Sequence, residues 1–258
     1  MKKRGARPYI LAETNWKTVR DLSYQLAVLP WGATEAHNYH LPYGTDNFQV
    51  ETVAERAAEL AWEAGAKVVI LPVIPFGVNT GQLDISLCIN MNPSTQLAIL
   101  KDITQVLHLQ QLPKLHILNG HGANHFKQMI RELAGIYPDV FISSTDWWKA
   151  SPMETYFYEP GDHAGEMETS AMLHIRPEWV RPLEEAGTGA AKVFKMKAFQ
   201  EGWATAQRAW SQVTEDTGTG NPEKATAEKG KIFMEACAEQ LASFWIELAH
   251  TDNQELYI

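Results

Sequence analysis

Short apolar runs alternate along the chain with longer segments whose apolar positions repeat at helical spacing. The runs lie at Leu26–Leu29, Lys67–Leu71, Leu115–Leu118 and Val140–Ser143. The second run is apolar without alternation, which is typical of strands in a parallel sheet that helices cover on both faces. We therefore expect all four runs to be strands.

The intervening segments have the apolar spacing and the end signals of helices. In the second helix, Asn92 takes the cap position and Pro93 the first turn, where a missing N–H costs nothing. The apolar stripe expected for the last helix includes Ile232, Phe233, Phe244 and Trp245. The four helices are expected over residues 47–64, 92–109, 126–136 and 222–248. Strand and helix in this alternation predict an α/β fold with a mostly parallel central sheet.

Composition and charge narrow the class of protein. The chain has 258 residues, of which 45% are hydrophobic, and a formal net charge of −9. This acidic excess disfavours binding to a phosphate backbone, so we expect no nucleic-acid partner. Neither a repeat nor a change of composition divides the chain, and we expect a single domain over residues 1–258.

Neither a membrane segment nor a cysteine framework is expected. The longest apolar run, residues 68–76, contains two prolines and is far shorter than the roughly 20 residues of a membrane helix. The basic start of the chain lacks the apolar segment of a secretory signal. Cys88 and Cys237 lie far apart without metal-binding spacing, so a disulfide framework or a cysteine zinc site is not expected. A cytoplasmic location fits these observations best.

Chemistry-bearing residues gather first in the polar stretch after the first strand. In an extended loop, Glu35 and His37 point the same way, and Gly44 lets the chain turn to bring Asp46 beside them. Two carboxylates and an imidazole are a usual ligand set for zinc or manganese in hydrolases. The alternative is that Asp46 only supports the start of the following helix and that Glu35 and His37 are solvated loop residues.

A second candidate follows the third strand, where Gly120 and Gly122 flank His121. The glycines leave the histidine uncrowded at the carboxyl end of a strand, the edge at which ligands bind in open parallel sheets. The competing interpretation is a dinucleotide-binding loop. It lacks its third glycine, since His125 stands in that place, and Ile142 stands where an acid is expected.

The third candidate is the pair His163 and Glu168. Residues five apart are separated by about 140° around a helix, so we expect His163 in a loop and Glu168 in the first helical turns. The alternative for Glu168 is an ordinary acid at a helix N-terminus.

Aromatic residues precede this third segment. Trp147 and Trp148 could wall a pocket for a small planar substrate, or could simply pack in the core. Substrate specificity is expected in residues 145–165 and 187–221, where periodicity is weakest. The six histidines outside the three segments are expected in core or surface roles, with His40 and His125 close enough to the candidate site to support its ligands.

Taken together, these segments resemble the creatininase (creatinine amidohydrolase) family. The matches run in family order, and they comprise Pro30–His37, His40–Pro42, Gly44–Asp46, Asn119–Asn124, His163–Gly165 with Glu168–Ser170, and Gly220–Pro222 with Ala225–Gly230.

The resemblance implies a three-layer α/β/α fold, a two-metal site for Zn2+ and/or Mn2+, and a homo-oligomer, often a hexamer. By motif position, Glu35, Asp46 and His121 would hold one metal, and His37 and Asp46 the second. The family's carboxylate two residues after the glycine-flanked histidine is replaced here by Ala123. Either Glu168 or a water takes its place, or the second site is weak.

The sequence thus predicts a metal-dependent amidohydrolase that cleaves a non-peptide C–N bond of a small-molecule amide through a metal-activated water. His163 would donate a proton to the leaving nitrogen or bind the substrate, and Glu168 would ligate metal or orient the water. Because the acid at position 123 is lost, creatinine is a doubtful substrate. A formamide deformylase and a non-catalytic binding relative are the alternatives. A serine hydrolase is not supported, because the G-x-S-x-G sequence does not occur.

Overall fold

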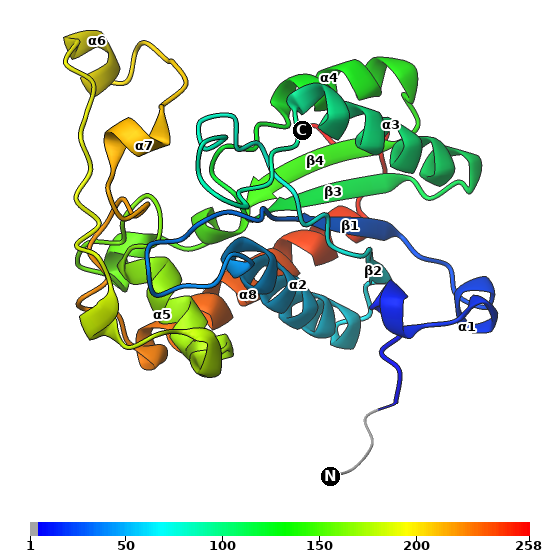
Figure 1. The fold of residues 1–258 in the computed structure, drawn as a ribbon. Coiled ribbons are helices and arrows are strands. Elements are labelled where there is room, and N and C mark those ends of the chain that lie inside the picture. Colours follow the sequence, from blue (N-terminus) through cyan, green and yellow to red (C-terminus); the bar gives the residue numbers. More distant parts are fainter. Residues whose placement is uncertain (1–4) are drawn as a thin grey trace.

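A four-stranded, fully parallel sheet lies at the centre of the computed structural model, which describes residues 5–258 and so leaves the first four residues of the basic start undescribed. The strand order is β2-β1-β3-β4 (Figure 1). The strands are β1 (Leu26–Trp31), β2 (Val68–Ile70), β3 (Lys114–Asn119) and β4 (Phe141–Asp146). All four predicted strands are confirmed.

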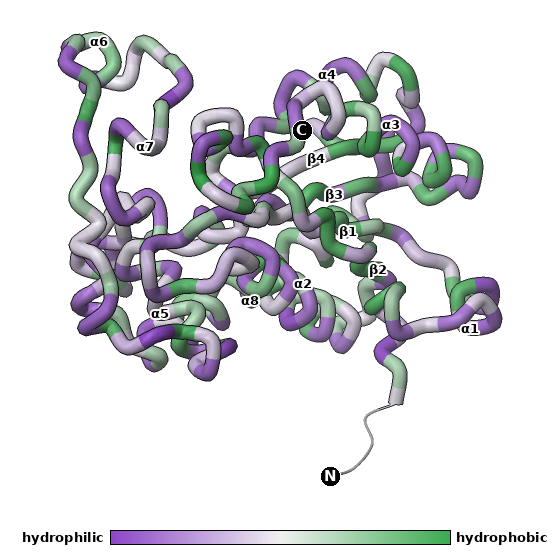
Figure 2. The backbone as a smooth tube through the Cα atoms, in the orientation of Figure 1, coloured by the Kyte–Doolittle hydropathy of each residue, from purple (hydrophilic) through white to green (hydrophobic). Residues whose placement is uncertain are grey.

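Helices cover both faces of the sheet and complete three layers. The helices α2 (Thr45–Glu63) and α8 (Ala227–His250) cover one face, and α3 (Pro93–Leu109) and α4 (Lys127–Ile136) cover the other (Figure 1). Each face carries its own cluster of buried apolar side chains. Figure 2 shows the hydrophobic positions concentrated along the strands and the hydrophilic ones on the outer helix surfaces. The predicted α/β/α architecture is confirmed.

The ends and faces of two helices differ from the prediction. The last helix begins at Ala227, not at residue 222, because the Thr226 side chain accepts the Lys229 backbone N–H and caps the helix there. Ile232 and Phe244, expected in its buried stripe, are 50% and 37% exposed. Asn92 does hold the cap position of α3, but its side chain makes no capping hydrogen bond.

The remaining helical segments are short, apart from α5 (Glu166–Ile175), which packs against α8 and α2. An arm containing α6 and α7 stands beyond the carboxyl ends of the strands (Figure 1). In the described part of the chain, the helices do not include one long and apolar enough to cross a membrane. The short segments are α1 (Trp16–Arg20), α6 (Lys197–Gln200), α7 (Trp210–Val213) and 3-10 turns at Leu11–Glu13, Trp147–Lys149, Met153–Thr155, Pro177–Trp179 and Leu183–Glu185.

The register of the sheet brings the candidate segments to one edge. Trp31 at the end of β1 pairs with Asn119 at the end of β3, and Asn119 pairs with Asp146 at the end of β4. The polar loops that follow these strands therefore start side by side, as ligand-binding loops do in open parallel sheets.

Candidate metal centre

Three segments bring buried acids and imidazoles to one place at this edge. Glu35 and His37 lie in the loop after β1, Asp46 lies in the first turn of α2, and His121 follows β3. Each of these four residues is at most 6% exposed. Buried charges of this kind need partners or a cation, so the alternative of solvated loop residues is excluded for Glu35 and His37.

Asp46 stands at the middle of the group. Its Oδ1 lies 3.0 Å from His37 Nε2, and its Oδ2 lies 3.0 Å from His121 Nδ1. Among the described residues, three sets of three each place one ligand atom per residue within 4.8 Å of the others. They are Glu35, Asp46 and His121, then His37, Asp46 and Glu168, and then Glu35, His37 and His163. The first two sets share Asp46.

The backbone fixes which nitrogen each of these histidines presents. His37 Nδ1 lies 3.1 Å from the Glu35 carbonyl oxygen, and His121 Nε2 lies 3.1 Å from the Val78 carbonyl oxygen. A carbonyl accepts only from an N–H, so the other ring nitrogen, which faces Asp46, is the one that could give its electron pair to a cation. Histidines that bind metals in proteins are oriented in this way.

The electrostatics of the histidines also fit a cation site. Burial alone would lower the pKa of His37, but the neighbouring carboxylates, Asp46 foremost, raise it to about 10. The pKa of His121 is raised well above its usual value against the same burial penalty, chiefly by Glu35. The negative potential that holds protons on two buried imidazoles is the potential that attracts a divalent cation.

The pKa values of the two acids Glu35 and Glu168 shift in opposite directions. Burial acts to raise the pKa of Glu35, yet the facing imidazoles, His121 first, hold it below its usual range. Glu35 Oε1 is buried without a hydrogen-bond partner of good geometry, although His121 Nδ1 is 2.8 Å away. Burial raises the pKa of Glu168.

Glu168 faces the same cavity as Ala123. It lies in the first turn of α5, and its Oε2 is 3.8 Å from His37 Nε2. The same oxygen accepts a hydrogen bond from the backbone N–H of Ala164 at 2.5 Å. The prediction of a helical Glu168 beside a loop His163 is confirmed. Ala123 lines the same cavity without offering a ligand.

His163 faces the centre from the loop before α5. Its Nε2 lies 2.8 Å from the Ala36 carbonyl oxygen, its Nδ1 lies 3.8 Å from Glu35 Oε1, and its ring centroid is 4.0 Å from that of His37. The loop is held by close backbone approach: a Cβ on Gly161 would lie 2.9 Å from Gly165 Cα.

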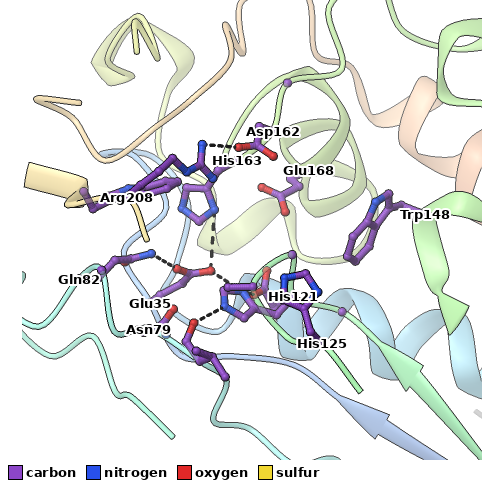
Figure 3. Close-up of a pocket in the computed structure, with 18 of the residues that line it drawn as sticks. Glu35, Asn79, Gln82, His121, His125, Trp148, Asp162, His163, Glu168 and Arg208 are labelled. Carbon is purple, nitrogen blue, oxygen red and sulfur yellow. Dashed lines mark hydrogen bonds and ion pairs between the residues drawn. The ribbon is translucent and has the colours of Figure 1, made fainter. Parts of the chain in front are cut away.

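A cavity of about 320 Å3 opens over these residues (Figure 3). Both segments expected to set specificity contribute to its wall, with Trp148 and Met153 from one and Arg208 and Trp210 from the other. Trp147 does not line it. Trp147 is fully buried and packs against Phe233 at 5.6 Å between ring centroids, so the predicted double tryptophan wall is reduced to Trp148.

The loop after β2 supplies residues that the sequence analysis missed. Gln82 donates a hydrogen bond to Glu35 Oε2, and Asn79 lines the same cavity (Figure 3). The position of this loop at the carboxyl end of a predicted parallel strand could have indicated that its residues reach the site. His125 lines the cavity while largely exposed, and buried His40 contacts Thr169 at 2.8 Å.

The protein is an α/β protein with a parallel sheet between helix layers. Two overlapping triads, Glu35–Asp46–His121 and His37–Asp46–Glu168, form a candidate dinuclear centre at the carboxyl edge of this sheet. The family model described as "Creatininase: Creatinine amidohydrolase" matches residues 12–245. The chain belongs to the creatininase family of hydrolases.

Individual relatives share both sequence and fold with the chain. A Bacteroides fragilis protein provisionally described as a creatinine amidohydrolase is 44% identical, with a TM-score of 0.90 over 97% of this chain and 99% of that one. The mycofactocin precursor peptide peptidase of Mycolicibacterium smegmatis is 26% identical over 84% of each chain. The creatinine amidohydrolase of Pseudomonas putida is 26% identical over 83% of this chain and 86% of its own. Two solved structures share the fold: a manganese creatininase, 21% identical with a TM-score of 0.73, and a mutant creatininase of Zn–Zn type, 20% identical with a TM-score of 0.75. Each alignment covers 92% of this chain and 96% of the other.

Proposed function

We propose that the protein is a metal-dependent amidohydrolase that uses water to cleave the C–N bond of a small-molecule amide. The observation that carries this proposal is the shared Asp46, whose two oxygens face two histidines that are each oriented by a backbone carbonyl. Glu35, Asp46 and His121 would hold one cation, and His37, Asp46 and Glu168 the other. Oxygen and imidazole ligands of this kind suit Zn2+ or Mn2+.

Divalent cations in such a site lower the pKa of water and polarise a carbonyl, which is the chemistry that amide hydrolysis needs. The residues of the chain manage the protons. Burial raises the pKa of Glu168, so this carboxylate is suited to accept a proton from water as its oxygen attacks the carbonyl carbon.

His163 is placed to complete the reaction. With its Nε2–H donated to the Ala36 carbonyl, its Nδ1 is the nitrogen turned toward Glu35 and the cavity. A protonated Nδ1 delivers its proton to the leaving nitrogen as the C–N bond breaks, which yields an acid and an amine. Trp148 on the cavity wall contacts the substrate.

The relatives indicate two kinds of substrate. The Pseudomonas putida relative is a creatinine amidohydrolase, and this similarity makes a small cyclic amide one candidate substrate. The Mycolicibacterium smegmatis relative is a precursor peptide peptidase, and this similarity makes a peptide amide the second candidate. Because Ala123 offers no carboxylate, we place formamides and other open amides ahead of creatinine.

Metal stoichiometry of the purified protein tests the centre. After loading with Mn2+ or Zn2+ and gel filtration, we expect two ions per chain for the wild type, one for Glu168→Gln and none for Asp46→Asn. Glu63→Gln is the matched control, since it removes the same charge from an exposed position at the end of α2. Unchanged metal content in Asp46→Asn, with the fold retained by circular dichroism, would refute the shared centre.

Hydrolysis is tested separately with a panel of lactams, formamides, cyclic amides and short peptides. Metal-dependent product formation that His163→Gln reduces at unchanged metal content supports the proposal. A fully loaded protein that binds these compounds but hydrolyses none of them would instead be a non-catalytic relative.

The assembly and location inferred from the sequence belong to the same proposal. We expect a homo-oligomer, a hexamer by family resemblance, of single-domain subunits in the cytoplasm. Sedimentation equilibrium measures the first, and fractionation of the source cells measures the second.

A further inference from the structure

One arginine stands on the wall of a cavity whose other titratable side chains are acids and imidazoles. Within residues 5–258, Arg208 is the only lysine or arginine that lines this cavity. Its Nη1 lies 2.8 Å from Asp162 Oδ2, and Figure 3 shows this pair at the rim beside His163. The proposed reaction uses neither residue of the pair.

The loop that carries Arg208 is fixed in place from two sides. The guanidinium carbon lies 4.5 Å from the ring centroid of Trp210, a stacking distance. The Trp210 backbone N–H donates to the Gly81 carbonyl at 2.9 Å, and Thr80 donates its hydroxyl to Gln207 at 3.2 Å. Arg208 is therefore held at the cavity as a preformed group, which reduces the entropy lost when it binds a ligand.

Arg208 is also close to the proposed reaction centre. The ring of Trp210 packs edge-on against His163, with 5.4 Å between centroids, and Arg208 stacks on the same indole. Asp162, its ion-pair partner, immediately precedes His163 in the chain. One indole thus separates the guanidinium from the imidazole that would protonate a leaving nitrogen, a spacing that suits a substrate carrying an anionic group near its scissile bond.

A ligand can readily replace Asp162 in its ion pair with Arg208. The two side chains are 41% and 63% exposed, and an ion pair this open contributes little stability because water screens it. A guanidinium has five N–H donors in a fork that matches a planar carboxylate. The Asp162 carboxylate, in contact through one oxygen, already shows that a carboxylate can reach this guanidinium.

We propose that Arg208 binds a carboxylate of the substrate in place of Asp162, so that the substrate is an amide bearing a carboxylate, such as an N-acyl amino acid. This proposal rests on the amidohydrolase function proposed above and specifies its substrate class. Neutral lactams would not use Arg208.

Equilibrium binding to the Mn2+-loaded protein tests the carboxylate preference. The probes are N-formylglycine and its neutral counterpart N-formylglycinamide, measured by calorimetry. The wild type is expected to bind the carboxylate about 10- to 100-fold more tightly, the range of a hydrogen bond to a charged group. Arg208→Gln should abolish this preference, and Arg208→Lys should restore part of it, since an ammonium lacks the fork.

Two further variants control the measurement. Arg181→Gln removes an arginine from an exposed ion pair with Glu185 that does not line the cavity, and it should keep the full preference. Asp162→Asn should tighten carboxylate binding, because it removes the competing anion. Metal content and circular dichroism verify that each variant is folded and loaded.

Four binding results would overturn the proposal. The first three are equal affinity of the wild type for both probes, equal weakening of both by Arg208→Gln, and competition by inorganic phosphate as strong as that by the carboxylate. The fourth is a carboxylate preference that Arg208→Gln retains, as expected for a carboxylate bound only through the cations.

Hydrolysis of the two probes separates this proposal from the function on which it rests. If neither is hydrolysed but the preference depends on Arg208, the carboxylate site stands and the amidohydrolase proposal fails for this substrate class. If both are hydrolysed at equal kcat/KM in the wild type and in Arg208→Gln, the amidohydrolase stands and the carboxylate site is refuted.

Discussion

The two adjacent tryptophans after β4 should respond to truncation in opposite ways. Trp147 is fully buried and contacts Phe233, whereas Trp148 is partly exposed and lines the cavity. The Trp147 indole N–H has no partner among the described residues, so Trp147→Ala loses packing but breaks no hydrogen bond. Replacing a buried tryptophan by alanine costs about 3–5 kcal/mol. In a chain of this length each kcal/mol lowers Tm by roughly 2–4 °C, so we expect Tm to fall by about 6–20 °C.

Trp148→Ala supplies the comparison. It should cost less than about 2 kcal/mol, because a partly exposed side chain has less area to lose, and its main effect should be on substrate affinity. Urea unfolding at fixed metal concentration measures the free energy of unfolding, and steady-state kinetics on an amide substrate measures KM. The reasoning is refuted if Trp147→Ala raises KM at unchanged stability, or if Trp148→Ala is the more destabilising change.

Two further predictions concern buried positions around the sheet. Burial lowers the pKa of His116 to about 3; because this value is below that of the unfolded chain, the unfolded state binds more protons, and stability is lost as pH falls below about 6.5. At pH 5 the loss is about 2 kcal/mol, and urea unfolding should show this pH dependence reduced in His116→Gln. A Cβ on Gly77 would lie 2.7 Å from His121 Cδ2, whereas one on Gly122 meets nothing within 4 Å. Gly77→Ala should therefore weaken Mn2+ binding about tenfold or more, with Gly122→Ala as the unaffected control, and equal affinities would count against the proposed role of His121.

The sequence predicted the elements of the fold well because the apolar pattern and the burial coincide in a parallel sheet. Each predicted strand lies between two helix layers, so its side chains are apolar on both faces and the run is conspicuous. The errors fall at helix ends and on helix faces. The start of α8 depends on one capping hydrogen bond by Thr226, and Ile232 is half exposed although it falls in the apolar stripe. Neither is a property of local periodicity.

The candidate centre was predictable to the extent that its residues follow strands. Glu35, His37 and His121 all lie in loops at the carboxyl ends of parallel strands, and the register of β1 and β3 brings these loops together. Gln82 and Arg208 were missed because an amide and an arginine in irregular segments carry no ligand signature. Trp147 was misplaced because two adjacent aromatic residues point in different directions, and only packing decides which of them faces the core.

The carboxylate of Glu168 links the triad of His37, Asp46 and Glu168 to the loop that carries His163. A carboxylate at position 123 would come from the loop that carries His121, whereas Glu168 comes from α5, which packs on α8 and α2. Glu168 also accepts the backbone N–H of Ala164, the residue after His163, which is held at a left-handed φ of 51°. If Glu168 holds a cation as proposed, any shift of its carboxylate toward His37 would act on the backbone that positions His163. Occupancy of that cation site and placement of the proposed proton donor would then be coupled through one side chain.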